Sequence, residues 1–172
     1  MSRERSAEPL DAAAIIRVLG LRPLEIEGGW FTETYRSPDP SPSGADPDRP
    51  ISTAILYLLT PDTFSEIHRL PGDEVFHAYL GDPVEIVTLA PDGSHEVTIL
   101  GSDILAGQRV QHVVPGGTWQ GARLRAGGRY ALLGTTMAPG FSYAEYESGV
   151  ATRLVASHPA AREWVEALTR DR

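Results

Sequence analysis

The stretch Phe64–Gly81 reads FSEIHRLPGDEVFHAYLG and places a Pro-Gly turn between two strand-like runs. Its polar side chains include His68, Glu74 and His77, which lie close together along the chain. A hairpin that turns at Pro71-Gly72 would bring all three into one small volume. No other segment concentrates this chemistry, so the sequence predicts a functional site here.

Each of these residues also has an ordinary structural interpretation. His68 could cap a strand, Glu74 could be solvated at the turn, and His77 could be a half-buried histidine of a sheet. Side chains alternate between the two faces of a strand, and His77 is an odd number of residues from Glu74. We therefore expect His77 to point away from Glu74 unless a β-bulge intervenes. Because His68 lies beside a turn, we expect it to be partly exposed.

A second segment, Gly107–Gln120, repeats this pattern as GQRVQHVVPGGTWQ. A polar strand leads to the turn Pro115-Gly116-Gly117, and the polar side chain of Gln120 then enters the next strand. Trp119 could stack on a flat ligand such as a sugar, or it could pack in the core. We predict that the two segments meet and line one site with His68, Glu74, His77, Trp119 and Gln120.

The rest of the chain consists of short strands separated by turns rich in proline and glycine. Ser52–Thr60 is an apolar run typical of a core strand, and Pro91-Asp92-Gly93 marks a turn between two more strands. Many short strands at regular spacing indicate an all-β sandwich or barrel. Helical periodicity at Leu10–Leu19 and at residues 158–170 predicts one short helix at each end. Because no linker divides the chain, we expect one domain over residues 1–172.

An alternating strand, WFTETYRS, follows Gly28-Gly29. It has no obvious pairing partner nearby in the sequence, and unpaired strand edges invite pairing. We therefore expect a homodimer in which residues 28–36 add to the sheet of a second copy. Residues 37–50 are so rich in proline, serine, aspartate and glycine that they predict a mobile loop, which is either functional or a tolerated surface insertion.

The composition narrows the class of partner. The chain has 172 residues and no cysteine, which excludes a disulfide framework, thiol catalysis and cysteine-ligated zinc. The net charge is -8 and there is no stripe of lysine or arginine, so we expect no binding to nucleic acid or to an acidic membrane surface. Neither a signal peptide nor a membrane span is evident, and we expect a soluble cytoplasmic protein that binds a small molecule.

The paired segments resemble the two sequence motifs of the cupin superfamily. The first motif runs Gly, HxH, three or four residues, Glu, six residues, Gly, and the second is PxG, two residues, His. His68, Glu74 and Gly81 stand at positions of the first motif, and Pro115-Gly116-Gly117 supplies the PxG of the second. The likeness implies that both segments belong to one cupin site.

Two positions depart from these motifs, because Leu70 replaces the second histidine and Gln120 replaces the last one. A typical cupin metal is held by three histidines and one carboxylate. Replacing an imidazole by an amide lowers the affinity for a metal, so we expect no tightly held ion. If a divalent metal binds, the resemblance implies His68, Glu74 and Gln120 as its ligands. The alternative is a metal-free pocket in which His68 and Glu74 act on a substrate as acid, base or hydrogen-bonding groups.

From about Leu10 to Pro159 the sequence is similar to cupin family 5, whose members are described as predicted sugar epimerases. The segments that carry the likeness are LGLRPLEIEGGWFTETYRS, IHRLPGDEVFHAYLGDPVEIVTL, VVPGGTWQGA and APGFSYAEYE. The family usually reads His-Pro-Glu-Gly-Gly where this chain has Glu25-Ile26-Glu27-Gly28-Gly29. The resemblance implies a double-stranded β-helix, the cupin jelly roll, which is often dimeric.

The segment GGWFTETY is also similar to the RGxFxE segment of the deoxysugar-nucleotide 3,5-epimerases, where such a strand helps to hold the nucleotide. Phe31 and Glu33 match that pattern, while Gly28 replaces the arginine that would be the strongest partner of a pyrophosphate. The residues expected to bind substrate are Phe31, Glu33, Tyr79, Trp119 and Gln120.

Epimerase chemistry removes a proton next to a carbonyl group, which needs a base whose pKa lies near neutrality. His68 suits this role and Glu74 could orient it, with His77 as the third catalytic candidate. The candidate acids for the opposite face of a substrate are Tyr35, Tyr57, Tyr79 and Tyr130. We expect an isomerase or epimerase that acts on a carbohydrate-like carbonyl compound, with a sugar or a sugar nucleotide as ligand. The alternatives are a non-catalytic module that binds a small ligand and a metal-dependent cupin enzyme.

Overall fold

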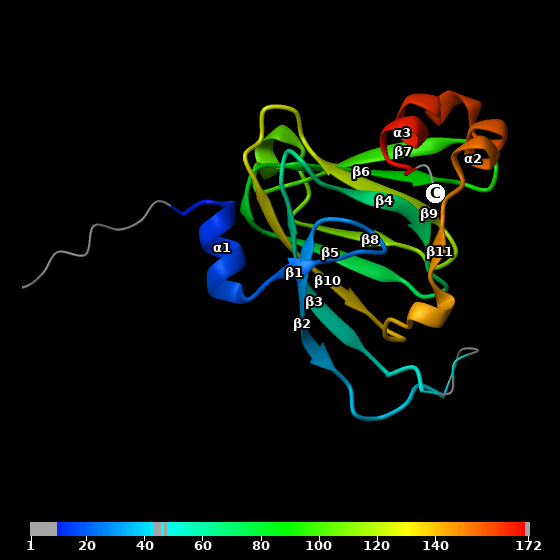
Figure 1. The fold of residues 1–172 in the computed structure, drawn as a ribbon. Coiled ribbons are helices and arrows are strands. Elements are labelled where there is room, and N and C mark those ends of the chain that lie inside the picture. The colour runs from blue at the N-terminus through cyan, green and yellow to red at the C-terminus, as the bar shows by residue number, and fades with distance from the viewer. Residues whose placement is uncertain (1–9, 43–45, 47, 171–172) are drawn as a thin grey trace, which may run out of the picture.

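The structure is a computed structural model and describes residues 10–42, 46 and 48–170. Its strands form two antiparallel sheets that face each other (Figure 1). The six-stranded sheet has the order β1 (Arg22–Pro23), β2 (Trp30–Arg36), β3 (Thr53–Leu59), β10 (Ala131–Met137), β5 (Glu74–Gly81) and β8 (Gln111–Val114). The five-stranded sheet has the order β11 (Glu147–Ser148), β4 (Phe64–Arg69), β9 (Trp119–Leu124), β6 (Val84–Leu89) and β7 (His95–Leu100).

The eight central strands follow the path of a double-stranded β-helix. Strands β3, β10, β5 and β8 lie side by side in one sheet, and β4, β9, β6 and β7 lie side by side in the other. The chain therefore crosses between the sheets after most of these strands, whereas β6 and β7 form a hairpin within one sheet. The predicted all-β jelly roll is confirmed. The strand pairings keep the two sheets separate, so the molecule is a sandwich and not a closed barrel.

The prediction of a hairpin at Pro71-Gly72 is wrong. Strand β4 pairs with β9 and β11, while β5 pairs with β10 and β8 in the opposite sheet. A Pro-Gly turn reverses the chain in either case, and local sequence does not state whether the next strand pairs with the previous one or crosses to the facing sheet. Pro115-Gly116-Gly117 makes the equivalent crossing from β8 to β9.

The two crossing turns are in direct contact. The backbone N–H of Gly117 donates to the carbonyl of Leu70 at 2.7 Å, and the N–H of Gly116 donates to the carboxylate of Asp73 at 2.8 Å. A Cβ atom at Gly116 would collide with the carbonyl oxygen of Pro71, so this approach requires glycine. The predicted meeting of the two segments is confirmed by these contacts.

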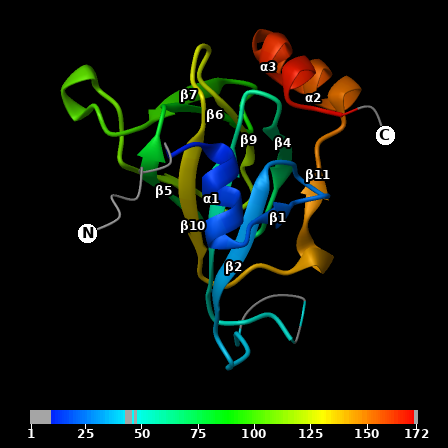
Figure 2. The ribbon, with the colours of Figure 1, turned by 60° about the vertical axis from the view of Figure 1, so that its left-hand side comes forward.

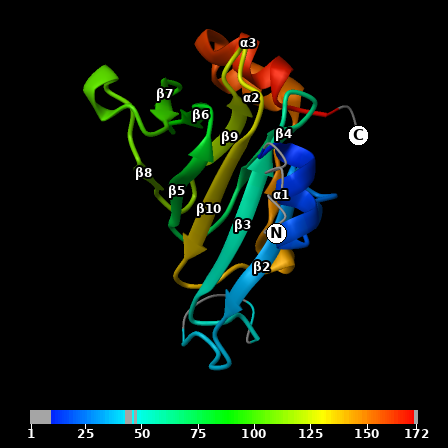
Figure 3. The same ribbon diagram turned by 90° about the vertical axis from the view of Figure 1, so that its left-hand side faces the viewer.

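Short helices cover the outer faces of the sheets (Figures 2 and 3). Helix α1 (Ala12–Leu19) is capped by Asp11 and ends at Gly20, and its Ile15 packs on the six-stranded sheet. Helices α2 (Ala151–Ser157) and α3 (Arg162–Ala167) pack on the five-stranded sheet. The prediction missed α2, which has only seven residues and ends where Pro159 begins the next turn. The 3-10 turns are η1 (Ile104–Ala106), η2 (Tyr143–Glu145) and η3 (Pro159–Ala161).

Strand β2 has a partner in its own chain, contrary to the premise of the dimer prediction. It pairs with β3 from Trp30 to Arg36, and β1 covers part of its other edge. The homodimer therefore stays a prediction, and an unpaired strand at residues 28–36 no longer supports it. In the loop of residues 37–50, Ser37 bonds to Ser52 and Ser41 to Arg49 through their backbones, while residues 43–45 and 47 lie outside the description.

The space between the sheets is apolar except beside the crossing turns. Its apolar side chains include Phe76, Val84, Ile86, Leu100 and Leu133. The buried polar residues of this interior include Ser65, His68, Glu74, Gln120 and Thr135. Helices of the described part of the chain are all too short or too polar to span a membrane.

Candidate functional site

His68, Glu74 and Gln120 meet in the interior of the sandwich, as the paired turns predict. His68 on β4 and Gln120 on β9 are directly opposite in the five-stranded sheet, and Glu74 begins β5 in the facing sheet. The amide nitrogen of Gln120 donates to Oε2 of Glu74 at 2.7 Å and lies 3.5 Å from Nε2 of His68. Gln120 therefore connects the imidazole of one sheet to the carboxyl group of the other.

A bulge in β4 turns His68 toward this interior. Ser65 lies opposite Ala122 and His68 lies opposite Gln120, so β4 has one more residue than β9 between these pairs. Nδ1 of His68 bonds to the carbonyl of Glu66 at 2.7 Å, which makes Nδ1 the protonated nitrogen and leaves Nε2 toward Gln120.

His68 is more deeply buried than we expected. Its ring stacks on Tyr146 with 5.0 Å between the ring centroids and an interplanar angle of 15°. The residue is 1% exposed, so the expected partial exposure is wrong. The crossing turn that follows β4 does not open to solvent at this point, because the segment that carries Tyr146 covers it.

Glu74 has an unusual electrostatic environment. Burial raises the pKa of its carboxyl group, and the negative charge of Glu27 raises it further. His68 and the hydrogen bonds from Thr135 and Gln120 act in the opposite direction, but the net change is upward. Glu27 itself is held in place by Ser65, whose hydroxyl donates to it at 2.5 Å.

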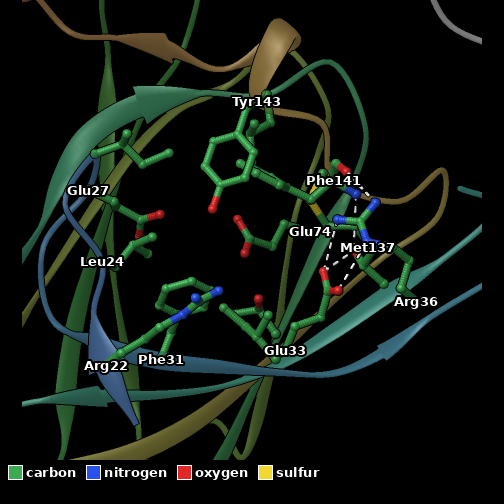
Figure 4. A pocket seen from close by; sticks show the side chains of 15 residues that line it. Arg22, Leu24, Glu27, Phe31, Glu33, Arg36, Glu74, Met137, Phe141 and Tyr143 are labelled. Carbon is green, nitrogen blue, oxygen red and sulfur yellow. Dashed lines mark hydrogen bonds and ion pairs between the residues drawn. The ribbon is translucent and has the colours of Figure 1, made fainter. Parts of the chain in front are cut away.

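A cavity of about 160 Å³ lies against Glu74. Figure 4 shows that the carboxyl groups of Glu27 and Glu74 and the hydroxyl of Tyr143 point into the same space. Phe31 and Glu33, which the sequence predicts to bind substrate, also line the cavity. The remaining lining residues are Arg22, Leu24, Ile26, Arg36, Thr53, Ile55, Leu70, Thr135, Met137 and Phe141.

Two arginines that the sequence interpretation missed, Arg22 and Arg36, line this cavity. Arg36 makes a bidentate pair with Glu33, from Nε at 3.0 Å and from a terminal nitrogen at 2.9 Å. A bulge between Glu33 and Tyr35 puts both members of that pair on the same face of β2, which simple alternation would not predict. Arg22 lies over the ring of Phe31, with 5.0 Å from its Cζ to the ring centroid.

Five predicted site residues do not line the cavity. His68 and Gln120 lie behind Glu74 in the interior, and the other three point to the outer faces of the sheets. His77 points to the outer face of the six-stranded sheet, where Nε2 lies 2.8 Å from the hydroxyl of Thr136. No bulge separates it from Glu74 in the pairing with β8, so alternation sends the two side chains to opposite faces. Tyr79 follows on that outer face and is exposed. Trp119 lies on the outer face of β9, under the guanidinium of Arg69, and packs toward the C-terminal helices.

The segment between β10 and β11 supplies side chains that the sequence interpretation missed. Phe141 and Tyr143 line the cavity, and Tyr146 covers His68. The run APGFSYAEYE offered a signal, because three aromatic residues in a non-helical, turn-rich stretch need an apolar surface to cover. Tyr57, one of the predicted acids, donates its hydroxyl to the carbonyl of Gly28, and burial raises its pKa well above the usual value.

The donor atoms around Glu74 do not fit a tightly held metal ion. Among the described residues no cluster of three histidine, cysteine, aspartate or glutamate side chains could hold one. Gln120 directs its amide N–H group, a hydrogen-bond donor, toward both His68 and Glu74. This leaves one imidazole nitrogen and one carboxyl group, fewer ligands than a first-row metal site needs.

Comparison with known proteins gives one family for most of the chain. The model of Cupin_5, described as Cupin superfamily (DUF985), matches residues 13–149. The uncharacterized protein YML079W of Saccharomyces cerevisiae is 30% identical over 134 residues, which cover 70% of this chain and 66% of that protein, just under two thirds of its length.

Two solved structures resemble nearly the whole chain. Protein SO0799 from Shewanella oneidensis has a TM-score of 0.84 and 30% identity, and the match covers 95% of this chain and 100% of that chain. A hypothetical protein from Leishmania major has a TM-score of 0.87 and 26% identity, and the match covers 94% of this chain and 100% of that chain.

Proposed function

Because the chain belongs to the Cupin_5 family (DUF985) of the cupin superfamily and buries a carboxyl group at a small cavity, we propose that it is an acid–base enzyme. Its substrate is a carbohydrate-like carbonyl compound, and its reaction moves a proton on the carbon next to the carbonyl group, as an isomerase or epimerase does. The observation that carries this proposal is the buried carboxyl group of Glu74 at the cavity beside Glu27, an environment that raises the pKa of Glu74. A carboxyl group titrating closer to neutrality is a more effective proton acceptor.

The geometry changes the roles of the two principal residues. Glu74 lines the cavity, whereas His68 lies behind it, stacked under Tyr146 and 1% exposed. We therefore assign proton removal to the carboxylate of Glu74 and a positioning role to His68. The imidazole acts through Gln120, whose N–H group fixes the carboxylate.

Tyr143 is placed to act on the substrate as well. Its hydroxyl points into the cavity that Glu74 lines (Figure 4) and makes no hydrogen bond with another residue of the described chain. In the proposed reaction, Glu74 takes the proton from carbon, the electron pair moves onto the carbonyl oxygen, and Tyr143 donates a hydrogen bond to that oxygen or a proton to the opposite face. Return of a proton to carbon completes the exchange.

Solvent deuterium exchange tests this function. A panel of keto-sugars and short hydroxyketones is incubated with the protein in deuterium oxide and analysed by mass spectrometry. We expect exchange at the carbon next to the carbonyl group with the wild type, and a loss of roughly a hundredfold or more with Glu74→Gln. Glu85→Gln is the matched control, because Glu85 pairs with Arg123 away from the cavity.

Two results would overturn the proposal. Exchange that persists unchanged in Glu74→Gln would remove this carboxyl group from the chemistry. Binding of panel compounds without exchange would favour a non-catalytic module that holds a small ligand.

A further inference from the structure

Arg22 presents an uncompensated positive charge to the cavity. It is exposed, it lines the cavity, and within the described chain no acidic side chain lies within ion-pair distance of it. Its guanidinium lies over the ring of Phe31, a buried residue with 8% exposure, so the ring gives it a fixed support (Figure 4). A guanidinium that stacks on an aromatic face keeps its N–H edge available for an anion.

The other charged side chains at the cavity favour Arg22 as the residue that binds an anionic group of a ligand. Arg36 is already neutralised by its bidentate pair with Glu33. Glu27 and Glu74 point their carboxyl groups into the space (Figure 4) and would repel a second anion there. A ligand with one anionic group is therefore oriented, with that group at Arg22 and its uncharged part at Glu74.

The size of the cavity limits the rest of the ligand. Sites for drug-sized molecules enclose roughly 300–1,000 Å³, and this cavity has about 160 Å³. A ligand of three to six carbons fits this scale, whereas the nucleotide part of a sugar nucleotide would have to lie outside.

We propose that the substrate is a small carbonyl compound with one carboxylate or phosphate group, which Arg22 binds while the carbonyl end lies at Glu74. The identity of the carbonyl end rests on the proposed function, and the anionic end rests on Arg22 alone. Arg22 is thus a specificity-determining residue. A sugar nucleotide, which the sequence resemblance suggests, would have to leave its nucleotide part outside the cavity, so we expect the small anion to bind more tightly.

Calorimetric titration with four probes tests this inference. Dihydroxyacetone, hydroxypyruvate and dihydroxyacetone phosphate share one hydroxyketone skeleton and carry no charge, a carboxylate and a phosphate group, respectively. UDP-glucose is the large probe. We expect at least one of the two small anions to bind ten times or more tightly than dihydroxyacetone, and the better one identifies the anionic group.

Variants show whether Arg22 is responsible. Arg22→Gln should weaken binding of the preferred anion by about 10- to 100-fold, while Arg22→Lys should keep part of it. Arg125→Gln, at an exposed turn, is the matched control and should bind like the wild type. Glu74→Gln should retain anion binding although it loses exchange, so failure of the inference and failure of the proposed function give different results.

Three outcomes would overturn the inference. These are equal binding of dihydroxyacetone and both anions, no binding of either small anion at about 10 mM, and unchanged anion binding by Arg22→Gln. Tighter binding of UDP-glucose than of both small anions would contradict the size argument.

Discussion

His68 and His77 come from one stretch of sequence, but His68 lies on the five-stranded sheet and points inward, whereas His77 lies on the six-stranded sheet and points outward. His68 faces the interior, where Nε2 meets the amide that holds Glu74. His77 faces outward and has both ring nitrogens engaged by neutral side chains, those of Thr136 and Gln111. Of the two, only His68 contacts the amide that bonds to a carboxyl group at the cavity, so the proposed positioning role belongs to His68 and membership of a cupin-like motif alone does not assign it.

The largest expected effect is a contrast between these two histidines. His68→Asn should slow deuterium exchange at least tenfold, because Glu74 loses a neighbour that favours its charged form. The same change should cost about 1–3 kcal/mol of unfolding free energy, since His68 is buried and hydrogen-bonded. Exchange assays and urea unfolding measure the two effects.

His77→Asn is the matched control for that pair. It should leave the exchange rate unchanged and lower the unfolding free energy by less than His68→Asn does. Equal losses of exchange in both variants would show that the interior position of His68 is irrelevant to the chemistry.

A second prediction concerns the connection between the two sheets. Gln120→Leu removes a hydrogen bond that lowers the pKa of Glu74, so this pKa should rise further. Because the proposed reaction uses the carboxylate form of Glu74, the acidic limb of the pH–rate profile should move to higher pH. Exchange at neutral pH should fall several-fold, by less than in Glu74→Gln. A limb that stays in place would mean that Gln120 does not control the ionisation of Glu74.

Glu27→Gln should have the opposite effect on the same profile. The negative charge of Glu27 raises the pKa of Glu74, so its removal should lower that pKa and move the acidic limb to lower pH. Exchange rates measured from pH 4 to pH 8, a range that spans roughly the carboxyl and histidine titrations, would show the shift. Movement to higher pH would contradict the assigned coupling.

The smallest expected effect is on stability. The pKa of Glu74 is raised in the folded state, so its contribution to stability is present at low pH and is lost as pH rises through that pKa. Glu74→Gln, which has no such titration, should therefore gain Tm relative to the wild type as pH rises from acid to neutral, by at most a few degrees. Thermal unfolding at several pH values tests this sign, and a relative loss of Tm would refute it.

The sequence predicted the fold and the centre of the site, but not the rim of the cavity. His68 and Glu74 flank the Pro71-Gly72 turn and Gln120 follows the Pro115-Gly116-Gly117 turn, and their strands bring the three side chains together. Phe31 and Glu33 were also expected at a ligand. Strand pairing and a bulge place the two arginines of the rim. Arg22 reaches Phe31 through the pairing of β1 with β2, and Arg36 reaches Glu33 through the irregularity in β2.

The segment after β10 shows a second limit of sequence interpretation. Tyr143 and Tyr146 lie in a stretch without strand or helix periodicity, so their direction depends on what the segment covers. The tyrosines that the sequence suggests as acids belong to predicted strands. In the structure, Tyr57 is buried and Tyr79 faces outward. Alternation alone does not distinguish the inner face of a sheet from the outer one when both contain aromatic residues.

Because the site depends on the contact between the two crossing turns, ligand binding requires the completely folded chain. His68 and Glu74 flank one turn, and Gln120 follows the other. Strands β5 to β8 lie between the two turns in the chain. Such a contact forms only after a long loop has closed, so the site is absent from any partly folded state that lacks this closure. A ligand at Glu74 would then stabilise the whole double sheet by mass action, and the rise in Tm with its concentration would measure its affinity.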